Sequence, residues 1–195
     1  MKKILLTYST VDGHTKTICE KILSYSKTSQ VDILPIDSNI NIKDYDTVVI
    51  GASIRYGKYR EEIFEFIKEN EELLNSKDNA FFSVNVVARK ENKNKPETNP
   101  YLIKFLNKIS WQPKILDVFA GKIDYPKYKF LDKYAIKFIM WITKGPTDTS
   151  KVYEFTDWNR VKSFAEKLEL WKVSTNQSNY LKRLNYICQE VSILQ

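Results

Sequence analysis

The strongest constraint on the fold of this chain is a regular alternation of short apolar runs with amphipathic segments. The run Thr47–Ala52 (TVVIGA) is continuously apolar, as expected for a strand that is buried on both faces of a parallel sheet. Such runs are followed by segments in which apolar residues recur every three or four positions, which is typical of helices. The predicted strands are Ile4–Tyr8, Val31–Ile36, Thr47–Ala52, Ala80–Val87 and Ile115–Ile123. The predicted helices are Thr15–Lys27, Arg60–Leu74, Tyr101–Ile109, Lys129–Ile142 and Asp157–Trp171.

This order of elements predicts an α/β fold, a doubly wound five-stranded parallel sheet with helices on both faces. A helical insert, residues 124–147, follows the last strand. The length of 195 residues suits one domain, which we place at residues 1–171. Residues 172–195 read as a polar linker and a tail, for which a short amphipathic helix and disorder are the two alternatives.

The first predicted strand leads into a helix through a turn rich in hydroxyl groups. The turn contains Ser9, Thr10, Asp12 and Gly13, and the helix begins at Thr15. The free backbone N–H groups at a helix start attract anions, so this segment suits a phosphate. Neither GxxxxGK[ST] nor GxGxxG is present, which favours a mononucleotide over ATP or NAD. An ordinary strand–turn–helix connection is the alternative.

The positive charge of the chain is concentrated in two segments. The formal net charge is +7, and Ala88–Lys108 and Lys122–Pro146 each contain six basic and two acidic residues. These segments should face an anionic ligand or surface. They carry no motif of a nucleic-acid reader, so nucleic acid is not an expected partner.

Cysteine and histidine are too few for several classes of site. Cys19 and Cys188 are the only cysteines and His14 is the only histidine, so neither a disulfide framework nor a metal site built on these residues is expected. The apolar start is too short for a signal peptide, and no run approaches the ~20 residues of a membrane span. We expect a reducing, cytoplasmic setting.

The insert contains a helical pattern with two distinct stripes. Lys129, Lys133, Lys137 and Lys144 align on one face, beside an aromatic stripe of Phe130, Tyr134, Phe138 and Trp141. A basic face next to an apolar face suits an anionic membrane surface or an apolar anionic ligand. A helix packed on the domain with a solvated lysine face is the alternative.

Three further loops should lie beside the hydroxyl-rich turn. They follow the third, fourth and fifth strands, and the carboxyl ends of parallel strands share one edge of the sheet. Gly13, Gly51, Gly57 and Gly121 lie at or near predicted strand ends. Backbone amides and small polar groups there suit a flat, polar ring such as isoalloxazine. Tyr56 either stacks on this ring or packs on its own loop.

Several runs together resemble one protein family. The segment Thr10–Thr15 resembles the FMN phosphate loop of flavodoxins. Longer runs resemble the flavodoxin-like, quinone-dependent protoporphyrinogen oxidases of bacterial haem synthesis. These runs are Val48–Tyr59, Phe81–Lys90, Phe119–Tyr128, Lys137–Thr149 and Tyr153–Val161. The resemblance covers about Met1–Leu170 and implies a flavodoxin-like fold with FMN as cofactor, while the tail from Lys172 departs from the family pattern.

The resemblance places the cofactor on four groups of residues. The phosphate loop falls on Ser9, Thr10, Asp12, Gly13, His14 and Thr15. The flavin ring would lie among Ala52, Ser53, Ile54, Arg55, Tyr56 and Gly57, then Ser83, Val84, Asn85, Val86, Val87, Ala88 and Arg89, and finally Gly121, Lys122, Asp124 and Tyr125. Asp12 should turn into its loop and accept backbone N–H bonds, and His14 should contribute its backbone N–H rather than its ring.

The resemblance also implies an activity and partners. FMN would take electrons from protoporphyrinogen IX and pass them to menaquinone or ubiquinone. No residue stands out as a catalytic acid or base. Candidate contacts to substrate or membrane are Arg55, Arg89, Lys90, Lys129, Lys133, Lys137, Phe138 and Trp141, with Lys122 as a further candidate for the propionates.

These partners imply a location for the protein. We expect it on the inner face of the cell membrane as a peripheral protein, and a homo-oligomer is left open. A flavodoxin-type NAD(P)H:quinone reductase and an electron-transfer flavodoxin are the alternative functions, although carriers of the latter kind are usually acidic.

Overall fold

A computed structural model describes residues 2–26, 30–36 and 39–168 of the chain. The described part contains a five-stranded parallel sheet, as predicted. Its strands are β1 (Lys3–Ser9), β2 (Gln30–Pro35), β3 (Thr47–Ser53), β4 (Asp78–Val84) and β5 (Ile115–Phe119), in the order β2-β1-β3-β4-β5. The expected tail, residues 172–195, lies outside the described residues.

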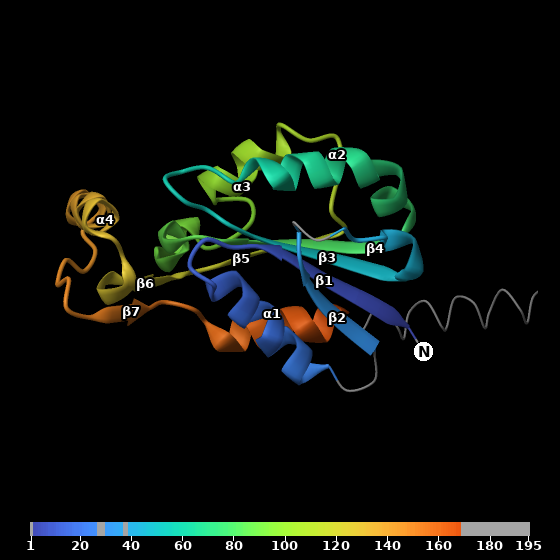
Figure 1. Cartoon of the computed structure of the whole chain (residues 1–195), viewed down its shortest axis with the longest axis horizontal. Coiled ribbons are helices and arrows are strands. Elements are labelled where there is room, and N and C mark those ends of the chain that lie inside the picture. Colours follow the sequence, from blue (N-terminus) through green and yellow to red (C-terminus); the bar gives the residue numbers. More distant parts are fainter. Residues whose placement is uncertain (1, 27–29, 37–38, 169–195) are drawn as a thin grey trace, which may run out of the picture.

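Helices cover both faces of this sheet (Figure 1). One face carries α2 (Glu61–Ser76) and α3 (Pro100–Leu106), and the other carries α1 (His14–Tyr25) and a helix over 158–168. Asp157 caps this last helix, because its side chain accepts the backbone N–H groups of Asn159 and Arg160 at 3.0 and 3.1 Å. The doubly wound prediction is therefore confirmed.

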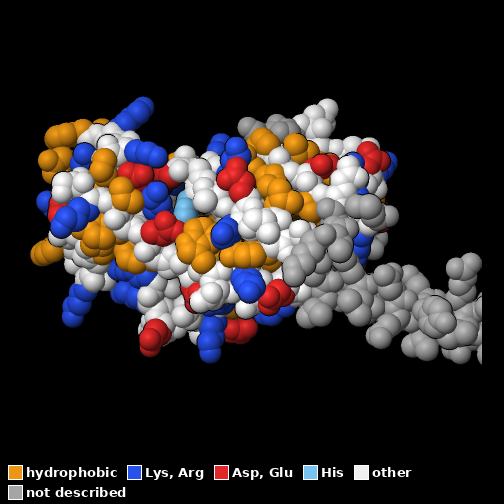
Figure 2. Space-filling view, turned by 90° about the horizontal axis from the view of Figure 1, so that it is seen from below, with side chains coloured by type: hydrophobic (Ala, Val, Ile, Leu, Met, Phe, Trp, Pro, Cys, Tyr) orange, Lys and Arg blue, Asp and Glu red, His pale blue; other side chains and the backbone are white. Residues whose placement is uncertain are grey.

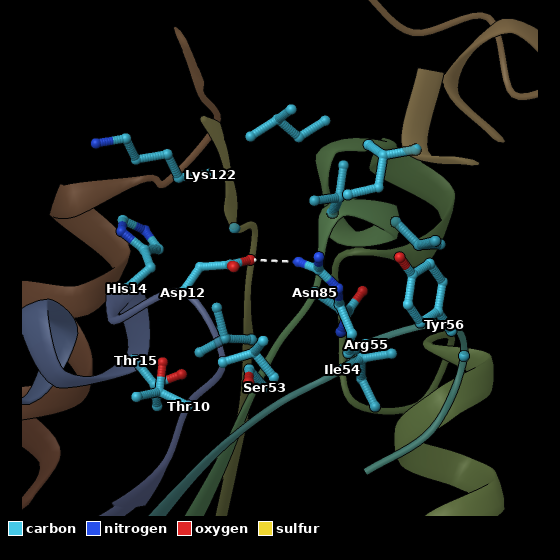
Figure 3. Close-up of a pocket in the computed structure, with 18 of the residues that line it drawn as sticks. Thr10, Asp12, His14, Thr15, Ser53, Ile54, Arg55, Tyr56, Asn85 and Lys122 are labelled. Atoms are coloured by element: carbon cyan, nitrogen blue, oxygen red, sulfur yellow. Dashed lines mark hydrogen bonds and ion pairs between the residues drawn. The ribbon is translucent and has the colours of Figure 1, made fainter. Parts of the chain in front are cut away.

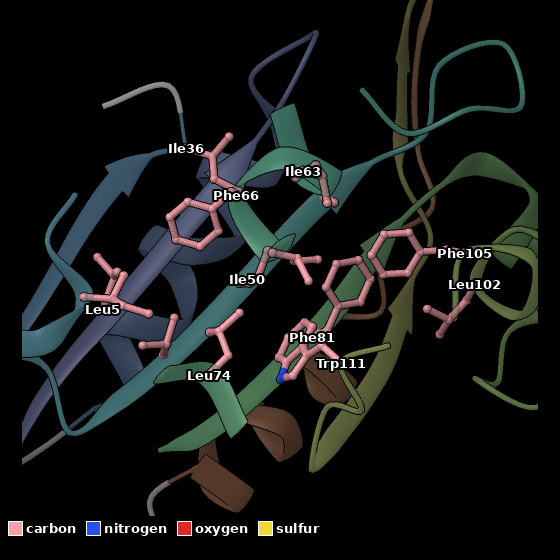
Figure 4. Packing of buried hydrophobic residues seen from close by; sticks show 14 of the residues in the cluster. Leu5, Ile36, Ile50, Ile63, Phe66, Leu74, Phe81, Leu102, Phe105 and Trp111 are labelled. Atoms are coloured by element: carbon pink, nitrogen blue, oxygen red, sulfur yellow. The ribbon is translucent and has the colours of Figure 1, made fainter. Parts of the chain in front are cut away.

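Each layer of helices has its own core. Under α2 and α3, the side chains of β3 and β4 pack with aromatic rings, and Phe81 stacks on Phe105 with ring centroids 4.7 Å apart (Figure 4). On the opposite face, Phe82 packs against Phe119 and Phe164. The two cores hold the strands rigidly, so the loops at their carboxyl ends start from fixed points.

The fourth strand ends three residues earlier than the sequence predicts. Asn85 turns the chain, because its side-chain oxygen accepts the backbone N–H of Ala88 at 3.0 Å. This contact starts a 3₁₀ helix over Val86–Arg89 where the apolar pattern had predicted more strand. A second 3₁₀ turn, Glu91–Lys93, follows it.

The fifth predicted strand, Ile115–Ile123, is in fact two strands in different sheets. With β4 ended at Val84, no neighbouring strand continues beside β5 beyond Phe119. The chain bends at Ala120 and Gly121 and forms β6 (Lys122–Asp124). This strand pairs antiparallel with β7 (Val152–Glu154), which the sequence pattern did not predict.

The pair β6 and β7 carries the predicted insert helix away from the sheet. Helix α4 (Phe130–Ile142) follows a 3₁₀ turn at Tyr125–Lys127 and lies at one end of the molecule (Figure 1). Met140 is the only buried residue of α4. The helix ends before Lys144, which has a φ of 56° and so does not continue the predicted lysine face.

The outer surface of α4 is apolar. The exposed fractions of Phe130, Leu131 and Trp141 are 73%, 80% and 68%. Figure 2 shows hydrophobic and cationic side chains side by side at this end of the molecule. The helix also packs on the domain through Met140, which contacts Ile123 and Tyr125, so the exposure of the outer side does not decide between the two interpretations of the insert. Within the described residues, no helix is both long and apolar enough to span a bilayer.

Candidate functional site

The loops at the carboxyl ends of the strands surround a cavity of about 440 Å³ (Figure 3). It lies beside the junction of β1 and β3, where the strand order reverses, which is the usual ligand site of such sheets. Most of the cofactor residues that the sequence predicted line this cavity. They are Thr10, Asp12, His14, Thr15, Ser53, Ile54, Arg55, Tyr56, Gly57, Val84, Asn85, Val86, Val87, Gly121 and Lys122.

One end of the cavity is the start of helix α1. Gly13 precedes the helix with a φ of 81°, a conformation that favours glycine, and no side chain caps the helix. The first turn also contains no acidic residue. Its N–H groups and the positive end of the helix dipole are therefore available to an anion.

Two buried hydroxyl groups in the cavity lining have no hydrogen-bond partner among the residues that the structure describes. These are the Oγ1 of Thr15 in α1 and the Oγ of Ser53 at the end of β3. A buried hydroxyl without a partner is costly, so a ligand in the cavity that bonds to these two groups would be stabilised. Thr15 belongs to the first turn of α1, which would face the phosphate, and Ser53 is at the end of β3. The residues present therefore fit FMN.

Asp12 does not turn into its own loop as expected. Its Oδ2 instead accepts a hydrogen bond of 2.7 Å from Nη1 of Arg55 (Figure 3). Nη2 of the same guanidinium pairs with Oδ2 of Asp132 in α4 at 3.1 Å. Burial lowers the pKa of Arg55, but Asp12, with Tyr56, Tyr128 and Asp132, more than offsets this effect, so the pKa is raised. One guanidinium therefore joins the phosphate loop, the loop after β3 and α4.

Tyr56 lies at the tip of a tight turn on the rim of the cavity. Tyr56 and Gly57 have φ values of 50° and 76°, and Arg55 and Lys58 exchange backbone hydrogen bonds across the turn. The Tyr56 hydroxyl donates to Asp132, and this bond raises the pKa of the phenol. The ring is half exposed beside the cavity, and its stacking on a flavin stays a prediction.

The ring of His14 is held by a hydrogen bond to Thr156. Its Nε2 lies 2.7 Å from the Thr156 hydroxyl, which itself donates to the carbonyl of Ala120 at 2.9 Å. Because that hydroxyl has one proton, Nε2 of His14 is the donor. Burial lowers the pKa of His14, with Glu154 opposing and Lys122 adding to the effect, so the ring is neutral near pH 7.

Two of the cations proposed for the propionates already have partners in the protein. Arg89 donates to the carbonyl of Val86 and to both oxygens of Thr143, at 3.0–3.1 Å, and so holds the end of α4. Lys122 lies 3.8 Å from the carboxylate of Asp124. Burial also lowers the pKa of Arg89.

The remaining expected cofactor residues lie outside the cavity lining. Tyr125 is fully buried and donates to the carbonyl of Pro146, and the Ser83 hydroxyl accepts from Tyr59. Ser9 donates to Glu62 at 2.7 Å. These side chains are used within the protein. Those outside the lining are Ser9, Gly13, Ala52, Ser83, Ala88, Arg89, Asp124 and Tyr125.

The sequence analysis missed one wall of the cavity. Its lining includes Val11, Tyr101, Ile123, Tyr128, Ile136, Ile139 and Met140. The last three come from the inner side of α4, whose helical spacing does place Ile136 and Met140 on one face. The insert helix therefore has an apolar inner side that walls the cavity and an apolar outer side that is exposed.

Comparisons with known proteins agree with this geometry. Residues 5–150 match the family model of a flavodoxin domain. A protoporphyrinogen IX dehydrogenase (quinone) of Leishmania major is 45% identical over 168 residues, which cover 84% of this chain and 73% of that protein. The protein of the same name from Escherichia coli K12 is 42% identical over 170 residues, with coverages of 85% and 94%.

Among solved structures, oxidised flavodoxin 1 from Bacillus cereus aligns with a TM-score of 0.43 and 14% identity, over 73% of this chain and 98% of that one. The family match supports FMN as the cofactor. The matched range and the identity of 42–45% over most of the chain show that this protein belongs to the flavodoxin domain family, among the relatives of the quinone-dependent protoporphyrinogen IX dehydrogenases.

Proposed function

We propose that this protein oxidises protoporphyrinogen IX to protoporphyrin IX and passes the electrons to a membrane quinone. FMN supplies the redox chemistry when it is bound, and the protein binds and orients it. The observation that carries the proposal is a cavity with a phosphate-binding end and an apolar wall, in a chain 42–45% identical to enzymes named for this reaction.

The phosphate-binding end would hold the cofactor. The uncapped N–H groups of α1 and the hydroxyl of Thr15 would bind the FMN phosphate, and Ser53 would bond to the flavin. Arg55 would keep this end of the cavity assembled by holding Asp12. His14 would contribute its backbone N–H, since its ring is engaged by Thr156.

The apolar wall would accept the substrate. Ile136, Ile139 and Met140 of α4 face the cavity with Ile54 and Tyr128. A porphyrinogen and a quinone both carry large apolar rings, which such a wall can shield from water. Exclusion of water also protects the reduced substrate and cofactor from side reactions.

Two measurements test the proposal. The purified protein with added FMN should show the visible absorption of a bound flavin. Anaerobic addition of protoporphyrinogen IX should then bleach that absorption, and a quinone should restore it. Bleaching by NADPH and not by protoporphyrinogen IX would instead favour an NAD(P)H:quinone reductase. Bleaching by neither donor would leave an electron-transfer flavodoxin.

We further propose that the outer face of α4 binds the anionic surface of a membrane. Phe130, Leu131, Phe138, Trp141 and Ile142 are all at least 58% exposed. Lysine side chains at positions 129, 133 and 137 flank this face. A short helix with exposed aromatic residues beside lysines is typical of segments that lie in the headgroup region of anionic lipids. A quinone dissolved in the bilayer would then meet the protein at the cavity wall.

Vesicle sedimentation tests the membrane proposal. The protein should bind vesicles that contain phosphatidylglycerol, and binding should weaken as salt is raised. The triple variant Lys129→Glu, Lys133→Glu, Lys137→Glu should lose this binding. The matched control is Lys21→Glu, Lys68→Glu, Lys162→Glu, which changes the net charge equally on exposed sites of other helices. Equal losses in both variants would contradict a specific role for α4.

A further inference from the structure

A second groove lies next to the cofactor cavity, on the side of α2 and α3. It has a volume of about 250 Å³ and lies between the loop after β3, the start of α2 and the length of α3. Three lysines line it, Lys58, Lys104 and Lys108, together with the single carboxylate of Glu61. We call this feature the lysine groove.

The three lysines have no anionic partner within the described part of the chain. Lys108 lies over the ring of Phe64 at 5.8 Å from its centroid, and none of the three forms an ion pair there. This contrasts with Arg55, Arg89 and Lys122 at the cofactor cavity, which are engaged by groups of the protein itself. The groove therefore brings together three lysines without an ion pair next to the cavity.

The lysine groove and the cofactor cavity share a rim. Gly57 and Tyr101 line both, and a Cβ at Gly57 would lie only 3.5 Å from the Tyr101 ring. A ligand that is wider than the cavity can therefore extend across the Tyr56–Gly57 turn into the groove.

Besides the three lysines, the groove is lined by aromatic side chains. Phe105 is buried, and Tyr59, Phe64 and Tyr101 are half-buried, so their rings form an apolar floor. An apolar floor under several ammonium groups suits a ligand with a hydrophobic body and more than one carboxylate. Inorganic anions would use only the edge, and neutral apolar ligands only the floor.

We infer that the lysine groove binds the propionate carboxylates of the tetrapyrrole substrate while the macrocycle reaches over the Tyr56–Gly57 turn toward the flavin. This inference rests on the proposed function, because it assigns the charged end of that substrate. It assigns the propionates to Lys58, Lys104 and Lys108. The sequence analysis had instead suggested Arg55, Arg89, Lys90 and Lys122. Protoporphyrinogen and protoporphyrin carry the same two propionates, so the groove would hold substrate and product alike.

Porphyrin titration tests the inference without relying on turnover. The FMN-loaded protein is titrated with protoporphyrin IX and with its dimethyl ester, in one non-ionic detergent, and porphyrin fluorescence is followed. The variant Lys58→Gln, Lys104→Gln, Lys108→Gln keeps the aliphatic stems and removes the charges. It should bind the diacid roughly tenfold more weakly, since each partly exposed ion pair contributes modestly. Its affinity for the diester should equal that of the wild type.

Lys68→Gln, on the exposed side of α2 and outside the groove, is the control and should leave both affinities unchanged. Equal diacid affinity in the triple variant and the wild type, or no porphyrin binding by the wild type, would overturn the inference. The proposed function fails separately if the wild type binds the diacid but protoporphyrinogen IX does not reduce its flavin. The charge-dependent affinity would still be measured in that case.

Discussion

At the scale of single residues, the site is marked by polar groups that the protein leaves without partners. Thr15 and Ser53 are the two in the cavity, and both are buried hydroxyls. In contrast, Asp12, Arg55 and Asp132 satisfy one another. A bound ligand would supply hydrogen bonds to the unpaired hydroxyls, and the paired charges hold together the loops that surround the cavity.

The hydroxyl of Thr15 should therefore matter more for FMN than for folding. In Thr15→Val we expect FMN affinity to fall by tenfold or more, because a hydrogen bond to a charged phosphate is worth about 1.5–3 kcal/mol. The free energy of unfolding of the flavin-free protein should stay equal or rise, since a buried unpaired hydroxyl is removed. Fluorescence titration with FMN and urea denaturation measure the two quantities. Thr15→Ser, which keeps the hydroxyl, should retain most of the affinity.

The ring of His14 should make the flavin-free protein less stable in mild acid. Burial lowers its pKa in the folded state. At pH values between that lowered pKa and the ordinary value of about 6.5, the ring is protonated in the unfolded chain and neutral in the folded chain. The free energy of unfolding should then fall as pH drops below about 7.

Urea denaturation at pH 7.5 and 5.5 checks this expectation. His14→Gln keeps an N–H donor for Thr156 but does not titrate, so its loss of stability across this range should be smaller. An equal loss in the variant and the wild type would show that other groups cause the pH dependence.

At the scale of elements, α4 is attached to the domain at its two ends. Asp132, in its first turn, pairs with Arg55 and accepts from Tyr56. At the other end, Arg89 donates to the carbonyl and hydroxyl oxygens of Thr143. Between these attachments only Met140 is buried. The helix is thus positioned by polar contacts at its ends and by the packing of Met140 against Ile123 and Tyr125, while other apolar side chains face the cavity or the outer surface.

Strand β3 depends on a glycine at its centre. A Cβ on Gly51 would lie 2.2 Å from the ring of Phe82, which is itself packed against Phe119 and Phe164. Gly51→Ala should therefore lower the free energy of unfolding by about 1–3 kcal/mol, the usual cost of overpacking.

Gly121→Ala is the matched control for that substitution. The nearest atoms to its added Cβ lie at 3.6 Å or more, so its effect on the free energy of unfolding should stay within about 0.5 kcal/mol. Chemical denaturation of the two variants compares them directly. A loss of similar size in both would mean that the Phe82 ring moves aside freely.

At the scale of the whole molecule, the cofactor should stabilise the fold. The cavity is formed by loops after β1, β3, β4 and β5, so one ligand joins segments from across the sheet. At an FMN concentration 100 times its dissociation constant, the gain is about 2.7 kcal/mol. For a chain of this size that corresponds to a rise in Tm of about 5–10 °C.

Riboflavin, which lacks the phosphate, is the control for that measurement. Thermal unfolding should show a clearly smaller rise in Tm with riboflavin than with FMN at the same concentration, because the start of α1 would have no anion to bind. Equal rises would indicate that the phosphate is held elsewhere.

The sequence by itself determined the parallel sheet, its helices and the strand–turn–helix connection at Ser9–Thr15. Each of these depends on local patterns, such as the apolar run Thr47–Ala52, the turn Ser9–Thr15 and the helical spacing in Phe130–Ile142. Strand number, helix number and fold class follow from those patterns and from the rules for parallel sheets. Within the described residues the fold class and the five strands of the parallel sheet were confirmed, while β6 and β7 were not predicted as separate strands.

Only the tertiary structure decided where strands end, which charges are paired and which way α4 faces. β5 stops at Phe119 because β4 has already turned away at Asn85, and Arg55 is engaged because Asp12 and Asp132 come within its reach. These outcomes depend on residues far apart in the chain, so no local pattern contains them. The cavity, its apolar wall and the free lysines beside it exist only once those distant segments meet.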